Sequence, residues 1–157
     1  MNTLQWTNVR NRVATGLAML FMVLVMAIPV LANSSSWYFY MYRDGRVVDG
    51  WNNGVTHNLS AGTLTLSGKI WTAAIYPNPI SVQPITVEVR QKTFLSSTLI
   101  CSSSPVSPSA NNIGSSFGVN FSKNCGSIVS SPDYYLFIWR AATDGREIEG
   151  NGTLSTP

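Results

Sequence analysis

The chain has 157 residues, of which 45% are hydrophobic and 11% are charged, and its formal net charge is +3 at pH 7. Globular chains carry about 25% charged residues, so this composition excludes a charge-rich disordered chain, a coiled coil and a histone-like nucleic-acid binder. One histidine and two cysteines are too few for a His/Cys metal cluster within one chain, and we expect neither a metal nor a cofactor.

The first 32 residues have the pattern of a secretory signal peptide. Arg10 and Arg12 precede an uncharged apolar run, and the sequence Val-Leu-Ala at 30–32 is followed by asparagine and serine. A basic segment, an apolar segment and a small residue before the cut are typical of such peptides. We therefore expect cleavage after Ala32, which leaves a single secreted domain of residues 33–157. A retained membrane anchor is the alternative, because about 20 apolar residues can just span a bilayer.

Cleavage leaves a nearly neutral chain, because it removes two of the ten basic residues and none of the seven acidic ones, for a formal charge of about +1. Such a chain lacks the concentrated basic patch that binds nucleic acid and the polybasic segment that draws proteins to anionic lipid. We therefore expect no nucleic-acid partner, and no further stretch is apolar and long enough to span a membrane as a helix.

Cys101 and Cys125 both lie in the exported part. An even number of cysteines in an oxidising compartment predicts a disulfide. A closed loop of about 25 residues should stabilise the fold by about 3 kcal/mol in the chain-entropy treatment. Two free thiols or an intermolecular bridge are the alternatives.

Apolar and polar side chains alternate from Ser36 onward, which predicts strands. No window after Ala32 supports an amphipathic helix of ten residues. Eight or so short strands with turn residues between them indicate an all-β fold, an antiparallel β-sandwich, with a small β-barrel as the alternative. We expect the strands at 36–42, 47–48, 63–67, 69–76, 82–91, 93–101, 117–121, 134–141 and 146–154, and loops at 50–62 and 102–112.

One pattern occurs twice: Asp-Gly-Arg, any residue, an aliphatic residue, an acid and a glycine, at 44–50 and at 144–150. Each copy follows a strongly aromatic strand. An Asp-Gly pair between two β-prone runs is typical of a type I′ hairpin, in which both central residues have a positive φ. We expect two hairpins that reached the same turn independently. A pseudo-symmetric pair, lying side by side at one end of the sandwich, is the alternative.

Three tyrosines, Tyr38, Tyr40 and Tyr42, alternate with apolar residues that we expect in the core. They would then form a stripe on an outer surface. Tyrosine combines an apolar ring with a polar tip, so such a stripe can stack on sugar rings, dock a protein or lie at a membrane interface. Trp51, in the following loop, joins this candidate binding set. The alternative is a cross-strand ladder covered by the aromatic residues of 134–141 that serves stability.

Catalytic chemistry finds little support. His57 lies in an Asn- and Gly-rich loop, where we expect it to be solvated, and no Gly-x-Ser-x-Gly elbow accompanies it. Glu147 and Glu149, which follow Asp144, are expected on one exposed edge strand about 7 Å apart, not across a cleft. A weak calcium site that joins these acids to those of the first copy, Asp44 and Asp49, is the alternative for them.

We therefore expect an exported, non-enzymatic β-sandwich that binds an extracellular partner through its surface. The partner would be a glycan, a cell-envelope component or a protein. A secreted toxin or bacteriocin-like protein that acts on target membranes is the first alternative. An enzyme or an enzyme inhibitor is the second.

Overall fold

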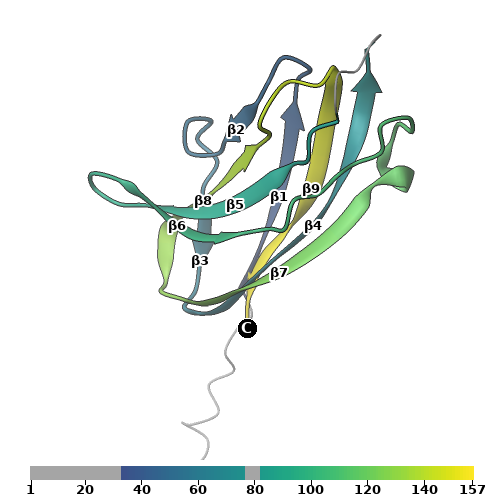
Figure 1. The fold of residues 1–157 in the computed structure, drawn as a ribbon. Coiled ribbons are helices and arrows are strands. Elements are labelled where there is room, and N and C mark those ends of the chain that lie inside the picture. Colours follow the sequence, from purple (N-terminus) through teal and green to yellow (C-terminus); the bar gives the residue numbers. More distant parts are fainter. Residues whose placement is uncertain (1–32, 77–81) are drawn as a thin grey trace, which may run out of the picture. The chain divides into compact units, whose positions relative to one another are not determined.

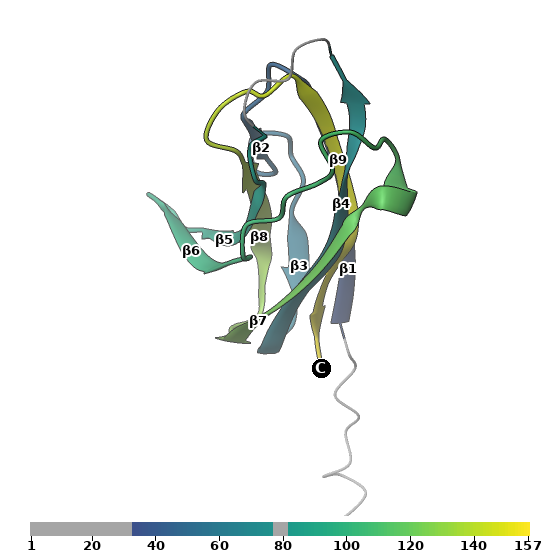
Figure 2. The same ribbon diagram turned by 45° about the vertical axis from the view of Figure 1, so that its right-hand side comes forward.

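The computed structural model describes residues 33–76 and 82–157, so the expected signal peptide lies outside the described residues. The described residues form two antiparallel sheets packed on one another (Figure 1), which confirms the predicted β-sandwich. Figure 2 shows the two sheets as separate layers. No helix within 33–76 and 82–157 has the length and apolar character needed to cross a membrane.

The first sheet has four strands in the order β1-β9-β4-β7. The long β4 combines the two strands expected at 63–67 and 69–76, with a β-bulge between Thr72 and Ala74. β9 lies between β1 and β4 and is therefore a central strand. The prediction of an exposed edge strand at 146–154 is wrong. The strand bounds are β1, Asn33–Met41; β9, Arg146–Thr156; β4, Gly62–Ile75; and β7, Val119–Ile128.

The second sheet has five strands in the order β2-β8-β5-β6, and β3 also pairs with β8. Tyr134, Leu136 and Ile138 of β8 point into the core. The alternate residues lie on the other face, where Tyr135 is buried and Phe137 and Trp139 are half-buried. Phe117, expected in a strand, lies in the short 3-10 helix η1 (Ser115–Phe117). The bounds are β2, Val47–Asp49; β3, His57–Leu59; β5, Thr86–Lys92; β6, Ser97–Ser102; and β8, Ser131–Trp139.

The core lies between the two inner faces. Trp37 illustrates how the sequence fits it: Trp37 pairs with Gly152, which pairs with Gly68 on β4. A Cβ at Gly152 would lie 2.5 Å from Cζ2 of the indole, and a Cβ at Gly68 would lie 2.3 Å from the same atom. The two glycines therefore leave the space that this large ring fills. The central core residues are Trp37, Phe39, Met41, Leu59, Leu64, Leu66, Ile70, Ile85, Val87, Val89, Tyr134, Leu136, Ile138, Ile148 and Leu154.

A disulfide joins Cys101 on β6 to Cys125 on β7, with 5.3 Å between the Cα atoms, as the sequence predicted. Both strands lie at the ends of their sheets. The bridge therefore ties together two edges that backbone hydrogen bonds do not join.

The two Asp-Gly pairs do not form hairpins, which corrects the sequence prediction. β1 pairs with β9 and β2 pairs with β8, so residues 42–46 carry the chain from the first sheet to the second. Residues 140–145 carry it back. Gly145 has a φ of 77°, whereas Gly45 does not adopt a positive φ. The first copy lies beside the segment that precedes the second, because the backbone N–H of Arg140 donates to the carbonyl of Arg46 at 2.9 Å.

Candidate functional site

The outer face of the first sheet gathers aromatic and acidic side chains from three adjacent strands and the residue that follows β4. In the register, Tyr40 and Trp71 both lie opposite Glu149, which stands on β9 between them. Residues of the same parity on these strands share a face, so the outward tyrosines meet the outward glutamates. We call this set the tyrosine–glutamate face: Tyr38, Tyr40, Tyr42, Trp71, Tyr76, Glu147 and Glu149.

Glu149 accepts hydrogen bonds from two neighbouring strands. The hydroxyl of Tyr38 donates to its Oε1 at 2.7 Å, and the indole Nε1 of Trp71 donates to its Oε2 at 3.1 Å. The hydrogen bond to Glu149 raises the pKa of Tyr38. The carboxylate thus lies between two aromatic rings, with each oxygen holding one donor.

Glu147 repeats this arrangement one step along β9. The hydroxyls of Tyr40 and Tyr76 donate to its two oxygens, the second at 3.2 Å. The hydrogen bond to Glu147, assisted by burial, raises the pKa of Tyr40 to about 12. Tyr40 therefore remains a protonated donor to Glu147 throughout the physiological range.

The tyrosine row is open to solvent. Tyr38 is 60% exposed and Tyr42 is 70% exposed, while Tyr40 packs edge-on against Tyr42 with 5.0 Å between ring centroids. The aromatic residues of 134–139 lie on β8 in the other sheet and do not cover the row. The guanidinium of Arg43 lies 4.8 Å from the ring centroid of Tyr76 and closes one end of the face.

A groove of about 450 Å³ lies beside the tyrosines, between β1 and the loop after β2. Tyr40 and Tyr42 line one side of it, and Asp49, Asn52 and Asn53 line the other. The carboxylate of Asp49 accepts hydrogen bonds from the backbone of Trp51, at 3.0 Å, and from the side chain of Asn52, at 3.0 Å. The groove therefore offers aromatic rings opposite amide groups.

Trp51 does not join the tyrosines. Its ring lies against Tyr135, with 6.1 Å between centroids, and under the amino group of Lys92 at 4.6 Å. Tyr135 and Lys92 both belong to the second sheet. The structure therefore brings together three of the four predicted binding residues. It adds Trp71, Tyr76, Glu147 and Glu149, which a search for a tyrosine row alone does not find.

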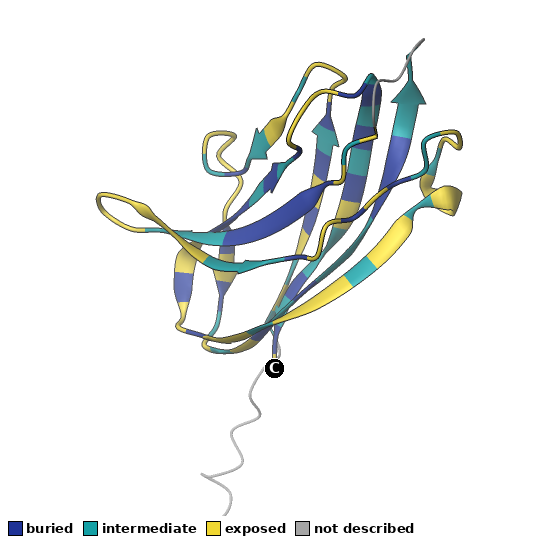
Figure 3. Cartoon of the chain, viewed as in Figure 1, coloured by how far each residue is buried: buried dark blue, intermediate teal, exposed yellow. Residues whose placement is uncertain are grey.

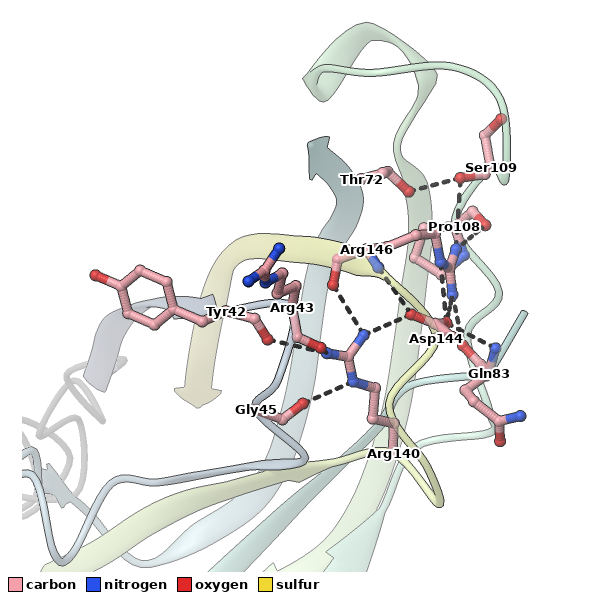
Figure 4. Close-up of polar contacts among 10 residues, drawn as sticks. All are labelled: Tyr42, Arg43, Gly45, Thr72, Gln83, Pro108, Ser109, Arg140, Asp144 and Arg146. Carbon is pink, nitrogen blue, oxygen red and sulfur yellow. Dashed lines mark hydrogen bonds and ion pairs between the residues drawn. The ribbon is translucent and has the colours of Figure 1, made fainter. Parts of the chain in front are cut away.

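Asp144 and Arg146 form a buried ion cluster with Arg140, shown in Figure 4. The carboxylate of Asp144 lies 2.7 Å from Nη1 of Arg140 and 2.6 Å from Nη2 of Arg146, and all three side chains are fully buried. Burial opposes ionisation of Asp144, but hydrogen bonds from Arg146 and the backbone of Gln83, with the charges of both arginines, outweigh it and lower its pKa.

The two arginines also hold together the loops at this end of the sandwich (Figure 4). Arg140 donates to the carbonyls of Tyr42, Arg43 and Gly45, at 2.7 to 2.9 Å. Arg146 donates to the carbonyls of Pro108 and Gln83, both at 2.8 Å. Because its carboxylate holds both guanidinium groups, Asp144 has no oxygen directed to a shared calcium site. The cluster is structural.

His57 is not a solvated loop residue. It lies on β3, is only 3% exposed, and its Nδ1 lies 2.8 Å from the hydroxyl of Ser35 on β1. Burial lowers the pKa of His57. Pairing of β3 with the central β8 draws this side chain inward, which a loop composition did not indicate.

Comparisons with known protein families, with characterised proteins and with solved structures find no match to this chain.

Proposed function

We propose that this protein is an exported, non-enzymatic glycan-binding β-sandwich, and that its tyrosine–glutamate face binds a neutral polysaccharide. One observation carries the proposal: exposed tyrosine rings lie on the same strand face as carboxylates that already accept hydrogen bonds from aromatic side chains. This is a surface on which both apolar and polar contacts are prepared in advance.

A sugar ring presents apolar C–H groups on its faces and hydroxyl groups around its rim. Tyr38 and Tyr42 offer apolar faces together with polar tips. Each glutamate has about four lone-pair positions and uses one per oxygen for an aromatic donor. The remaining positions can accept hydroxyl groups from a sugar, with the carboxylates already held in place.

The charge of the face favours a neutral glycan. Two carboxylates lie on it, and Arg43 at one end is the cation that contacts its aromatic rings. Like charges brought together disfavour binding, so an anionic polysaccharide would be repelled. Tyr38 and Tyr42 are four residues apart on an extended strand, about 13 Å, so the face can contact more than one sugar unit.

The arrangement of the carboxylates argues for binding over hydrolysis. Glu147 and Glu149 are two residues apart on one strand and face the same way. A ligand laid on this face would have both acids on one side. Glycosidases place their two carboxylates on either side of the bond that breaks.

Export is supported by the disulfide between Cys101 and Cys125. Such bridges form and persist in oxidising compartments and are rare in the cytosol. The sequence pattern of the first 32 residues points the same way.

Two measurements test the proposal. One is affinity electrophoresis through gels that contain neutral polysaccharides, and the other is retention on insoluble glucan and chitin. We expect saturable retention by at least one of these materials. The double variant Tyr38→Ala/Tyr42→Ala should lose at least tenfold in affinity, because both exposed rings are removed. Phe94→Ala/Leu95→Ala, which also removes exposed apolar groups but from the other sheet, should bind as the parent does. Failure of the parent to bind any neutral polysaccharide would overturn the proposal.

A second candidate function, action on target membranes, has one observation in its favour. The loop between β5 and β6 carries Phe94, 98% exposed, and Leu95, 88% exposed, at its tip, and Figure 3 shows this loop projecting from the sandwich. Thr93 and Ser96 close the loop through hydrogen bonds of 2.8 Å. An apolar tip held on a two-stranded ribbon can enter the boundary between lipid head groups and acyl chains.

Sedimentation with vesicles of phosphatidylcholine and phosphatidylglycerol, and dye release from the same vesicles, test this candidate. If the tip enters lipid, Phe94→Ala/Leu95→Ala abolishes sedimentation, whereas Tyr38→Ala/Tyr42→Ala does not. The two double variants therefore assign binding either to the hairpin tip or to the tyrosine–glutamate face. Absence of sedimentation and dye release for the parent protein would exclude the membrane candidate.

A further inference from the structure

The groove beside the tyrosine–glutamate face has the dimensions of a ligand site. Its volume is about 450 Å³, within the range of about 300–1,000 Å³ that is usual for small-molecule sites. Tyr40 and Tyr42 line its β1 side, and the loop at 50–56 that follows β2 contributes to the other side. Because Tyr38, Tyr40 and Tyr42 follow one another along the chain, a glycan that lies on this row reaches the groove at its Tyr42 end.

The loop opposite the tyrosines is a single turn that is closed at both ends. At its start, Oδ1 of Asp49 accepts the backbone N–H of Trp51 at 3.0 Å. At its end, Gly54 has a φ of 71°, and the backbone N–H of Val55 donates to the carbonyl of Gly50 at 2.7 Å. A glycine in this conformation, followed by such a bond, is typical of the end of a helical turn. A loop that is already ordered loses less conformational entropy when a ligand binds.

Two neighbouring asparagines of this loop, Asn52 and Asn53, are exposed and line the groove. Nδ2 of Asn52 donates to Oδ2 of Asp49 at 3.0 Å. The oxygen and nitrogen of one amide point in different directions, so Oδ1 of Asn52 is directed away from Asp49 and can accept. The side chain of Asn53 makes no hydrogen bond within the described part of the chain, and its Nδ2 can donate. A ligand in the groove can therefore reach both an acceptor and a donor.

The groove also offers an exposed apolar group and little charge. Val47, which is 48% exposed, lines it next to Val48. Its one carboxylate, that of Asp49, already holds donors from Trp51 and Asn52. No lysine or arginine occurs among the described residues that line the groove, so an anionic sugar has no cation to pair with there. The groove therefore suits an uncharged group that combines a donor, an acceptor and a small apolar end.

We propose that this groove recognises the acetamido group of an N-acetylated amino sugar, so that the glycan bound by the tyrosine–glutamate face contains N-acetylhexosamine units. This inference rests on the proposed function. An acetamido group has one N–H, one carbonyl oxygen and one methyl group. Oδ1 of Asn52 accepts from the N–H, Nδ2 of Asn53 donates to the carbonyl, and Val47 contacts the methyl group. The sugar ring itself lies against Tyr42.

Two trisaccharides form a matched pair of probes. Triacetylchitotriose and cellotriose have the same β-1,4-linked chain, and they differ only in the acetamido or hydroxyl group at C2 of each unit. A site that provides hydrogen-bond partners for a group discriminates strongly against an analogue that lacks it. In isothermal titration calorimetry we expect triacetylchitotriose to bind at least about tenfold more tightly than cellotriose. Deacetylated chitotriose, which carries amines at the same positions, should bind no more tightly than cellotriose.

Substitution of the asparagines assigns this preference to the groove. Asn52→Ala/Asn53→Ala should lower the affinity for triacetylchitotriose to that for cellotriose. Asn53→Ala, which removes a side chain without an intramolecular hydrogen bond in the described residues, should fold as the parent does and lose part of the preference. Asn111→Ala/Asn112→Ala is the control, because it also removes two consecutive exposed asparagines, and neither lines the groove. It should keep the full preference.

Three results would overturn this inference: equal binding of triacetylchitotriose and cellotriose, tighter binding of deacetylated chitotriose than of the acetylated form, or an unchanged preference in Asn52→Ala/Asn53→Ala. Absence of binding by any trisaccharide would overturn it as well. The proposed function is decided separately, by retention on neutral polysaccharides. A parent protein that is retained on glucan and does not distinguish the trisaccharides would keep the proposed function and lose the acetamido site.

Discussion

The two copies of the Asp-Gly-Arg pattern have the same sequence character and opposite surroundings. In the first copy, the side chain of Asp44 is 86% exposed and lies 3.3 Å from Arg43. In the second copy, Asp144 is fully buried between Arg140 and Arg146. Both copies connect the two sheets at the same end of the sandwich. The difference follows from the partners that each aspartate has: Arg140 and Arg146, four residues before Asp144 and two after it, enclose its carboxylate, whereas the Arg43 beside Asp44 is itself half exposed.

The acidic residue at the sixth position of each copy, Asp49 in the first and Glu149 in the second, also has different hydrogen-bond partners. Asp49 accepts hydrogen bonds from the next turn of its own loop. Glu149 accepts them from Tyr38 and Trp71 on the two strands that flank β9. The first copy continues into the short β2 at the end of a sheet, whereas the second begins a central strand. A central strand has a neighbour on each side, so its polar side chains acquire distant partners.

Replacement of the two aspartates gives the largest contrast. Asp144→Asn removes the charge that compensates two buried arginines, and we expect the free energy of unfolding to fall by about 3–5 kcal/mol. Asp44→Asn changes an exposed pair, and we expect less than about 0.5 kcal/mol. Urea denaturation of the two variants and the parent measures both values. Equal effects of the two substitutions would contradict the assignment of the cluster as structural.

The two aspartates should also differ in how they affect the stability of the protein at acidic pH. Because the pKa of Asp144 is lower in the folded protein than its usual value of 3.8, the unfolded chain binds the proton first as the pH falls. The stabilisation is complete above the unfolded pKa and is lost as the pH falls through the folded one. Asp44→Asn should keep this acid-dependent loss, and Asp144→Asn should lack the part that belongs to this group.

A smaller effect is expected at Glu149. Glu149→Gln keeps the shape of the side chain but removes its charge, which weakens the hydrogen bonds from Tyr38 and Trp71 and the acceptor offered to a sugar. We expect about a tenfold loss of affinity for the retained polysaccharide, equal to about 1.4 kcal/mol. Affinity electrophoresis measures it, with Asp44→Asn as the control that removes a carboxylate outside the face. Unchanged migration of Glu149→Gln would remove this glutamate from the proposed site.

Alternation along the chain predicted the sandwich and the inward and outward faces of β1, and the even number of cysteines predicted the disulfide. It could not predict that β1 pairs with β9, because the register between strands far apart depends on the whole fold. The hydrogen bond from Tyr40 to Glu147 was therefore not predicted, although both side chains were expected on an outer surface. His57 was misplaced for a related reason. Local composition indicated a solvated loop, whereas β3 pairs with β8 and the side chain of His57 is buried, next to Ser35, which lies 22 residues earlier in the chain.

The smallest expected effect is a change in the pKa of a single tyrosine, Tyr40. Glu147 occupies the fourth position of the second copy, where the first copy has Val47. The hydrogen bond to Glu147 raises the pKa of Tyr40 to about 12, because ionisation would break that bond and place two negative charges together. In Glu147→Gln the carboxylate charge is absent, so the pKa of Tyr40 should fall toward its ordinary value of 10.0.

Ultraviolet absorbance of tyrosinate during an alkaline titration measures this change. Six tyrosines contribute to the signal, so Tyr40→Phe identifies the step by removing it. In the parent that step should come at high pH, and in Glu147→Gln it should move to lower pH, while Asp44→Asn should titrate as the parent does. Superimposable curves for the parent and Glu147→Gln would mean that the carboxylate does not hold Tyr40. The face would then lack the preset acceptors that distinguish the second copy from the first.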